Sequence, residues 1–270
     1  MNWDGLDIGI LGPAALAGLI VLATHVPLGT RVLARGIIFI DLAIAQIAAL
    51  GVVIAQYFGM DEHGFGIQVA AATAALLGAA LLNATDKRWP EFQEPLIGTL
   101  FVLAASGGIL ALANNPHGGE HLKDLLIGQI LWVSPGQLWT AAIASVVLVA
   151  VMLWRGNRLD GLAFYALFAL SITVSVQLIG VYLVFASLIV PALATVGMRG
   201  RNRLLAAYSI GLLGYVSGLA LSALLDLPSG AMIVWTLAAC GALVRLLLPA
   251  GRVDPAGVTG AAQEAIKPGS

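Results

Sequence analysis

The chain is poor in charged residues and in cysteine. Asp, Glu, Lys and Arg make up 10% of its 270 residues, and 60% are hydrophobic, whereas about a quarter of a soluble domain is usually charged. No stretch is polar enough to form a separate soluble domain. The one cysteine, Cys240, cannot form an intrachain disulfide and lies in an apolar run, which is typical of a small buried residue.

Signatures of nucleotide binding and of single-chain enzymes are also absent. The sequence has no G-x-x-x-x-G-K-[ST] phosphate loop, no H-E-x-x-H helix, no G-x-S-x-G elbow and no C-x-x-C pair. We therefore predict that the chain is not an enzyme and binds no cofactor of its own. If it does work, the energy must come from an ion gradient or from another chain.

Long apolar runs fill the sequence instead. Runs of about 20 residues are long enough to cross a hydrocarbon core as helices, and we expect nine, with cores at 8–28, 36–58, 65–84, 95–114, 137–154, 161–178, 181–197, 204–224 and 230–248. The predicted fold is an all-α bundle of membrane-spanning helices over residues 1–250, followed by a short unstructured cytoplasmic tail at 251–270. No polar loop separates the sixth and seventh runs, so Gly180 marks either a tight turn or a break in one helix.

The basic residues indicate the orientation of these spans. With the N-terminus outside, only Lys123 of the 13 Lys and Arg residues would lie on the outer side, as the positive-inside rule requires. The C-terminus would then be cytoplasmic. On the outer side, DLLIGQILWVSPGQL (124–138) is too interrupted to cross the membrane, and we expect a short interfacial helix there, anchored by Trp132 and Trp139.

Four stretches resemble the permease subunits of the bacterial ABC importers for zinc, manganese and iron. In the family's order, they are PLGTRVLARG with FIDLAIAQIAALG (27–36 and 39–51), DLLIGQILWVSPGQL (124–138), SVQLIGVYLVFASLIVPALAT (175–195) and LSALLDLPSGAMIV (221–234). The resemblance runs from about residue 27 to 248, and it rests on four motifs with matching order and spacing relative to the ends of the spans.

The resemblance implies a type II ABC-importer permease that works as a homodimer in the bacterial plasma (inner) membrane. It implies two cytoplasmic ATPase subunits, which would hold ATP and Mg²⁺, and a periplasmic or extracellular metal-binding protein that delivers the ion. The pathway would lie at the dimer interface, and the transported substrate would be a divalent metal, zinc or manganese in the first place and iron in the second.

The second span departs from the family pattern, in which an Asp is followed four residues later by a His. Alignment on Gly51 places Leu42 at the Asp position and Gln46 at the His position, while the carboxylate of this chain, Asp41, lies one residue earlier. Asp41 and Gln46 are five residues apart, or about 140° around a helix, so they cannot form the same pair on one face.

The connection between the fifth and sixth spans is a second departure. The family has a longer connection there, with a short helix expected to dock on the ATPase, whereas only RGNRLDG (155–161) is present here. Coupling would fall to Arg155, Arg158 and Asp160, or to another loop such as TDKRWPEFQEP (85–95), or would be lost.

Several polar residues are candidates for the pathway, each with a structural alternative. Asp41 could relay metal or protons, or it could pair with Arg31 or Arg35 or cap a neighbouring helix, because a carboxylate at depth costs about 2.5–3.5 kcal/mol and usually faces protein or water. Gln46 could line the pathway or bridge two helices. His25 could be a ligand or a hydrogen-bonded interface residue.

Further candidates lie in the outer loops and in the seventh span. His63, His117 and His121 stand near acidic residues and could receive a cation from a delivery protein, or could simply be solvated. Gly180 and Pro191 suggest either a hinge near the pathway or close helix packing.

Three functions follow from these observations: an ATP-driven metal permease, a proton- or sodium-driven secondary transporter with Asp41 as the titrating group, and a non-transporting membrane subunit descended from such permeases. The resemblance favours the first. Whether uptake depends on an ATPase chain discriminates among the three.

Overall fold

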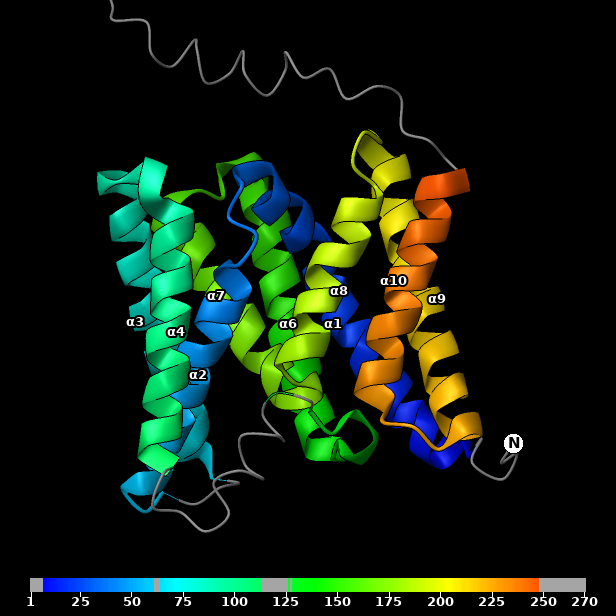
Figure 1. Cartoon of the computed structure of the whole chain (residues 1–270), viewed down its shortest axis with the longest axis horizontal. Coiled ribbons are helices and arrows are strands. Elements are labelled where there is room, and N and C mark those ends of the chain that lie inside the picture. Colours follow the sequence, from blue (N-terminus) through cyan, green and yellow to red (C-terminus); the bar gives the residue numbers. More distant parts are fainter. Residues whose placement is uncertain (1–6, 61–63, 113–125, 127, 248–270) are drawn as a thin grey trace, which may run out of the picture.

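The protein is a bundle of antiparallel helices, seen in a computed structural model that describes residues 7–60, 64–112, 126 and 128–247 (Figure 1). Each of the nine predicted apolar runs corresponds to a helix within this part of the chain. The helices are α1 (Ile8–Arg35), α2 (Ile40–Tyr57), α3 (Phe65–Arg88), α4 (Gln93–Leu112), α6 (Pro135–Arg155), α7 (Gly161–Ile179), α8 (Val181–Ala194), α9 (Gly200–Leu225) and α10 (Ser229–Leu247). Short 3₁₀ turns are η2 (Pro90–Phe92), η3 (Ile130–Trp132) and η4 (Gly156–Arg158).

Eight of these helices are long and apolar enough to cross a membrane, and α8 is the exception. With 14 residues, α8 is about 21 Å long at 1.5 Å per residue, which is shorter than a hydrocarbon core. Between α7 and α8 the chain reverses at one residue, Gly180, with φ 77° and ψ 164°. The joint that the sequence left open is therefore a tight turn.

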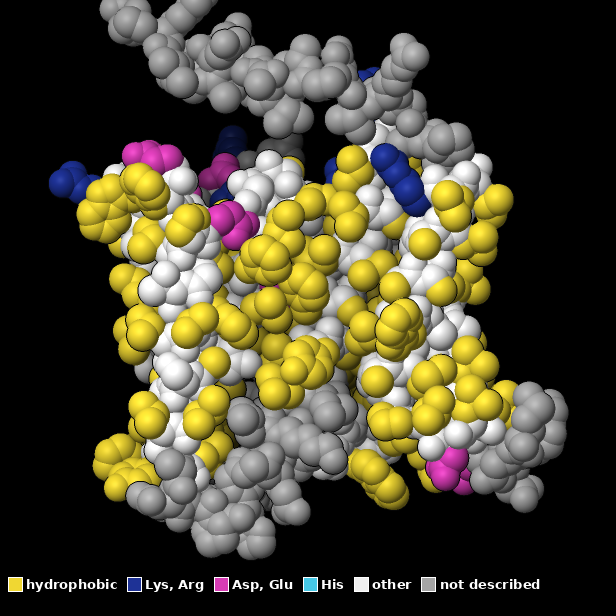
Figure 2. All heavy atoms as spheres, in the orientation of Figure 1, with side chains coloured by type: hydrophobic (Ala, Val, Ile, Leu, Met, Phe, Trp, Pro, Cys, Tyr) yellow, Lys and Arg dark blue, Asp and Glu magenta, His cyan; other side chains and the backbone are white. Residues whose placement is uncertain are grey.

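The two ends of the bundle differ in their content of basic residues. Every described Lys and Arg lies at the end where α1, α3, α6 and α10 finish and where α7 and α9 begin, and Figure 2 shows their side chains along the upper edge of the molecule. The start of α1 and the end of α10 lie at opposite ends of the bundle, as an odd number of antiparallel helices requires (Figure 1).

The boundary between the first two spans differs from the prediction. Helix α1 continues through Pro27 to Arg35 instead of ending near residue 28. A proline inside a helix frees the carbonyl four residues earlier, and here the Tyr208 hydroxyl of α9 donates to that carbonyl, Ala23 O, at 3.3 Å. The chain then descends, and α2 begins only at Ile40, below the upper end of the bundle (Figure 1).

Small residues allow α8 to pack closely between α1 and α10. A Cβ atom placed on Gly29 of α1 would lie 2.0 Å from Leu188 O and 3.3 Å from Ala192 Cβ, both of α8. On the other side, a Cβ atom on Gly241 of α10 would lie 3.4 Å from Ala194 Cβ. The small residues beside Pro191 thus allow α8 to pack closely against both neighbours, and the predicted hinge at Gly180 and Pro191 stays a prediction.

The segment 128–132, which the sequence predicts on the outer side and which we call the outer segment, is held against the turn between α7 and α8. Gly128 has φ +70°, and a Cβ atom there would lie 2.3 Å from the Ile179 carbonyl and 2.4 Å from Gly180 N. Ile130 is buried, whereas Trp132 is exposed, as an interfacial anchor should be. Trp139 is also exposed, but it belongs to the start of α6 and not to a separate interfacial helix.

Two arginines of α1 pin the short connection between α6 and α7. Arg31 donates to Gly156 O at 3.1 Å, and Arg35 donates to Leu159 O at 3.2 Å and pairs with Asp160. The Arg35 guanidinium also lies 3.9 Å from the ring centroid of Phe164. This connection is therefore fixed against the end of α1.

Arg35→Lys is expected to lower the free energy of unfolding by about 1 kcal/mol, because an ammonium group cannot keep the two hydrogen bonds and the stacked geometry together. Melting of the purified protein in detergent measures this change. Arg158→Lys, at an exposed residue of the same connection, is the control and should melt like the wild type. Equal melting of both variants would show that the Arg35 contacts contribute nothing.

Candidate functional site

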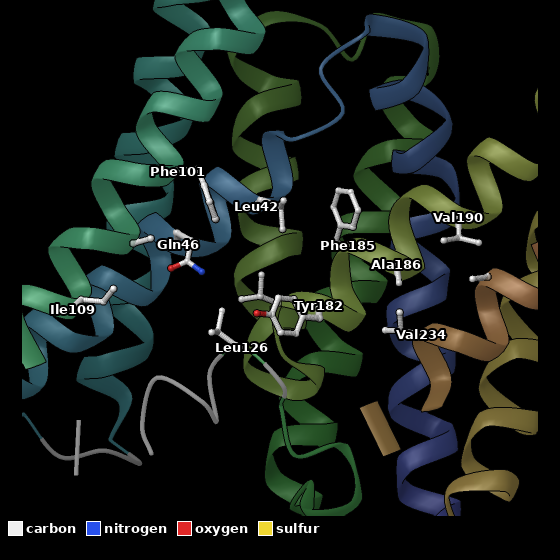
Figure 3. A pocket seen from close by; sticks show the side chains of 13 residues that line it. Leu42, Gln46, Phe101, Ile109, Leu126, Tyr182, Phe185, Ala186, Val190 and Val234 are labelled. Carbon is white, nitrogen blue, oxygen red and sulfur yellow. The ribbon is translucent and has the colours of Figure 1, made fainter. Parts of the chain in front are cut away.

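A cavity of about 540 Å³ lies between α2 and α4 on one side and α8 and α10 on the other (Figure 3). Its wall is almost entirely hydrophobic. The described lining residues are Leu42 and Gln46 of α2; Phe101, Ala105 and Ile109 of α4; Leu126, which lies just before the segment 128–132; Val181, Tyr182, Phe185, Ala186 and Val190 of α8; and Val234 and Ala238 of α10. We call this cavity the central pocket.

Aromatic and hydrophobic residues bound the central pocket at both ends. Phe185 stacks on Phe39, the residue before α2, with ring centroids 6.2 Å apart and planes 2° from parallel, so this pair bounds the end where α2 begins. Leu126 and Tyr182 lie at the opposite end (Figure 3). The turn at Gly180 is two residues from Tyr182, so the outer segment supports this end of the pocket.

Among the described residues that line the central pocket, two have polar side chains. Gln46 projects from α2, and the Tyr182 hydroxyl points toward the side from which Gln46 comes (Figure 3). Leu42 and Gln46 are four residues apart and share one helix face, and both line the pocket. These are the two positions that the resemblance described above places at the Asp and His of the family pattern.

Asp41 lies on a different face of α2. It is 1% exposed, belongs to the first turn of the helix and is not among the pocket-lining residues. Neither carboxylate oxygen has a hydrogen-bond partner among the described residues. Since Arg31 and Arg35 bind the connection 156–160 instead, the predicted alternative that one of them pairs with Asp41 is wrong.

His25 is likewise away from the central pocket. It is fully buried in α1, and its Nδ1 lies 3.0 Å from Val21 O, so Nδ1 carries the proton and donates to that carbonyl. Its Nε2 has no hydrogen-bond partner among the described residues. The predicted roles of His25 and Asp41 in the pathway stay predictions.

The remaining candidates are distributed over the molecule. The three outer histidines, His63, His117 and His121, lie outside the described residues. Within the described part, no three His, Cys, Asp or Glu residues stand close enough together to hold a metal ion. Arg155 and Arg158 are exposed at the end of the bundle that carries the basic residues.

Sequence reasoning missed the aromatic wall of the central pocket. Phe101, Tyr182 and Phe185 line it, but nothing in their local sequence separates them from other apolar residues of the spans. A usable signal is the four-residue spacing of Phe101, Ala105 and Ile109, which places them on one face of α4.

Comparison with known proteins identifies the family. The sequence model described as the ABC 3 transport family matches residues 7–164 and 157–247, and the two matches overlap at 157–164, across the connection between α6 and α7 and the start of α7. The manganese transport system membrane protein MntC of Halalkalibacterium halodurans is 26% identical over 250 residues, which cover 85% of this chain and 84% of that protein. The high-affinity zinc uptake system membrane protein ZnuB of Buchnera aphidicola is 20% identical, with 83% and 92% covered.

A solved structure shows the same fold. A chain of PsaBC from Streptococcus pneumoniae, determined in complex with Fab, superposes with a TM-score of 0.75 at 19% identity, over 95% of this chain and 98% of that one. The helices and the sequence match agree with the resemblance found in the four motifs. The chain belongs to the ABC 3 transport family.

Proposed function

We propose that this chain is the permease subunit of an ATP-driven importer for a divalent transition metal, with manganese and zinc as the first candidates. The observation that carries the proposal is the family match over residues 7–247, supported by relatives named as manganese and zinc transport proteins. The chain would work as a homodimer in the bacterial plasma membrane, with its N-terminus outside, together with cytoplasmic ATPase subunits and an outer metal-binding protein.

We propose that the central pocket is part of the transport pathway, because it is a cavity between helices near the middle of the bundle. Gln46 would face the passing substrate. The connection 156–160 is pinned to α1, so it is poorly suited to reach a partner. The turn between α3 and α4 exposes Trp89 and Phe92 at the same end of the bundle, and we propose this turn as the docking site for the ATPase.

ATP-dependent uptake tests the proposed function. Proteoliposomes with the permease and its ATPase, ATP inside and the metal-binding protein outside should accumulate ⁶⁵Zn²⁺ or ⁵⁴Mn²⁺. An ATPase variant that binds ATP without hydrolysing it should abolish this uptake. Accumulation by the permease alone down a proton gradient would instead support a secondary transporter, and no uptake in any form would support a non-transporting subunit.

A further inference from the structure

Four arginines lie together where the connection between α8 and α9 meets the end of α10. Arg199 directly precedes α9, Arg201 and Arg203 belong to its first turn, and Arg245 belongs to the last turn of α10. The guanidinium group of Arg245 donates from Nη1 to Val196 O at 2.7 Å, so it reaches across to this connection. We call the four residues the arginine patch.

The packing of α9 against α10 brings these two helix ends together. A Cβ atom on Gly218 of α9 would lie 2.5 Å from Ile233 Cα of α10, and a Cβ atom on Gly214 would lie 3.0 Å from Leu237 Cα. The two helices are therefore antiparallel and in close contact, and the end of α10 lies beside the start of α9 (Figure 1). The arginine patch is thus assembled by tertiary structure from two separate segments.

Other basic residues at this end of the bundle have acidic neighbours. Lys87 and Arg88 directly follow Asp86 in the chain, and Arg35 pairs with Asp160. Each of these basic groups has a carboxylate either within two residues of the sequence or in direct contact.

The helices that carry the arginine patch supply no such balance. Residues 181–225 and 229–247, which form α8, α9, α10 and the connection between α8 and α9, contain its four arginines and no other charged side chain. The remaining residues, 248–270, have two basic and two acidic side chains, so they leave this excess of positive charge unchanged. Like charges at short range repel one another, and an anion between them would relieve the repulsion.

A hydrophobic surface continues from the arginine patch toward the middle of the bundle. Leu205 and Leu212 of α9 and Leu243 of α10 are each about half exposed, at 54%, 46% and 56%. Both helices are long and apolar enough to cross a membrane. Figure 2 shows hydrophobic side chains covering the helices below the basic upper edge. Acyl chains of a lipid would contact this surface.

Positive charges at the end of two membrane helices, with apolar side chains directly beneath them, match the two parts of an anionic phospholipid. Arginine binds phosphate oxygens through paired, charge-assisted hydrogen bonds. Basic segments near an anionic leaflet are attracted to it by about 1 kcal/mol per Lys or Arg. The positive-inside rule accounts for the side of the membrane on which arginines lie, but not for their concentration at one pair of helices.

We propose that the arginine patch is a binding site for an anionic phospholipid. The arginines hold the phosphate of the headgroup, and the acyl chains lie along the exposed leucines of α9 and α10. The inference goes beyond the proposed function and does not rest on it. The site also lies on other helices than the proposed docking turn, which joins α3 and α4.

Native mass spectrometry of the purified full-length chain in detergent tests the proposal. The probes are dioleoyl phosphatidylglycerol, dioleoyl phosphatidylcholine and glycerol 3-phosphate. Phosphatidylglycerol should bind at least tenfold more tightly than phosphatidylcholine, which has the same acyl chains and no net charge. It should also bind at least tenfold more tightly than glycerol 3-phosphate, which has no acyl chains. Equal binding of the two lipids, or equally tight binding of the soluble phosphate, would overturn the proposal.

A matched pair of triple variants locates the lipid. The first variant changes three arginines of the patch to glutamine, Arg199, Arg201 and Arg203. The control changes three exposed basic residues elsewhere at the same end of the bundle to glutamine, Lys87, Arg88 and Arg158. The patch variant should bind phosphatidylglycerol at least tenfold more weakly than the wild type, whereas the control should stay within twofold. Equal loss in both variants would reveal general attraction to net charge and would overturn the proposal.

A single substitution keeps the test decisive if the triple patch variant fails to fold. Arg201 is exposed, so Arg201→Gln should fold normally and weaken phosphatidylglycerol binding about fivefold, the effect of one basic residue at an anionic surface. Arg158→Gln is its control and should bind like the wild type. Unchanged binding in Arg201→Gln would overturn the proposal.

The same variants distinguish a lipid site from a protein interface. A patch variant that binds phosphatidylglycerol like the wild type but no longer retains the ATPase subunits would show that the patch contacts a protein, and this would overturn the proposal. Lipid binding is measured without the ATPase. Failure of ATP-dependent uptake by the wild type would therefore remove the proposed function and leave the lipid site standing.

Discussion

Gly29→Ala is expected to lower the free energy of unfolding by about 3 kcal/mol, the upper part of the range for overpacking a closely packed interior. The added Cβ would lie 2.0 Å from Leu188 O and 3.0 Å from Leu188 C. These are backbone atoms of α8, so no side-chain rotation can relieve the overlap and the two helices must separate. The higher helix propensity of alanine offsets only about 1 kcal/mol.

Gly98→Ala is the matched control for this prediction. Gly98 also lies inside a helix, α4, and a Cβ atom there would meet nothing within 4 Å. This substitution should leave the stability unchanged or raise it by up to about 1 kcal/mol. Thermal melting followed by tryptophan fluorescence in detergent distinguishes the two variants. If Gly29→Ala melted at the wild-type temperature, α1 and α8 would not be in the close contact described.

The number and order of the helices could be predicted because each span carries its own signal. An apolar run of sufficient length is a local property, and all nine predicted runs are helices. The limits of α1 could not be predicted in the same way. Pro27 would be expected to end the helix, whereas α1 continues to Arg35, and the carbonyl that the proline frees accepts a hydrogen bond from the Tyr208 hydroxyl, which comes from a helix far along the chain.

The register of α2 was partly predictable. Helical periodicity separates Asp41 from Gln46, and the structure places Gln46 on the central pocket and Asp41 within the bundle. Gly51 fixes this register, because a Cβ atom there would lie 2.6 Å from Ala74 Cβ of α3. The depth at which α2 begins was not predictable, since the segment before it is held by a tertiary contact, the hydrogen bond that Ile38 N donates to Glu94 of α4 at 2.5 Å.

The central pocket itself could not be derived from the sequence. Its wall combines α2, α4, α8 and α10, and no local pattern states which faces of four helices will meet. The same limit applies to the connection between α6 and α7. Its shortness was visible in the sequence, but its fixation by Arg31 and Arg35 depends on tertiary contacts.

Gly128→Ala is expected to abolish ATP-dependent metal uptake, or to reduce it at least tenfold, by releasing the outer segment from the turn between α7 and α8. Alanine at φ +70° costs roughly 1–2 kcal/mol, and its Cβ would overlap the Ile179 carbonyl at 2.3 Å. The segment must move, so Ile130, which is 1% exposed, loses burial that contributes about 1.5–3 kcal/mol.

This local change should reach the central pocket, because Leu126 and Tyr182 lie within two residues of the contact and line one end of it. Hydrogen exchange of residues 128–132 should become faster in Gly128→Ala while α9 and α10 keep wild-type protection. Gly136→Ala is the control in the same region, since a Cβ atom there meets nothing within 4 Å, and it should preserve both uptake and exchange. If Gly128→Ala showed faster exchange but normal uptake, the outer segment would be dispensable for transport, and the pathway would not depend on this end of the central pocket.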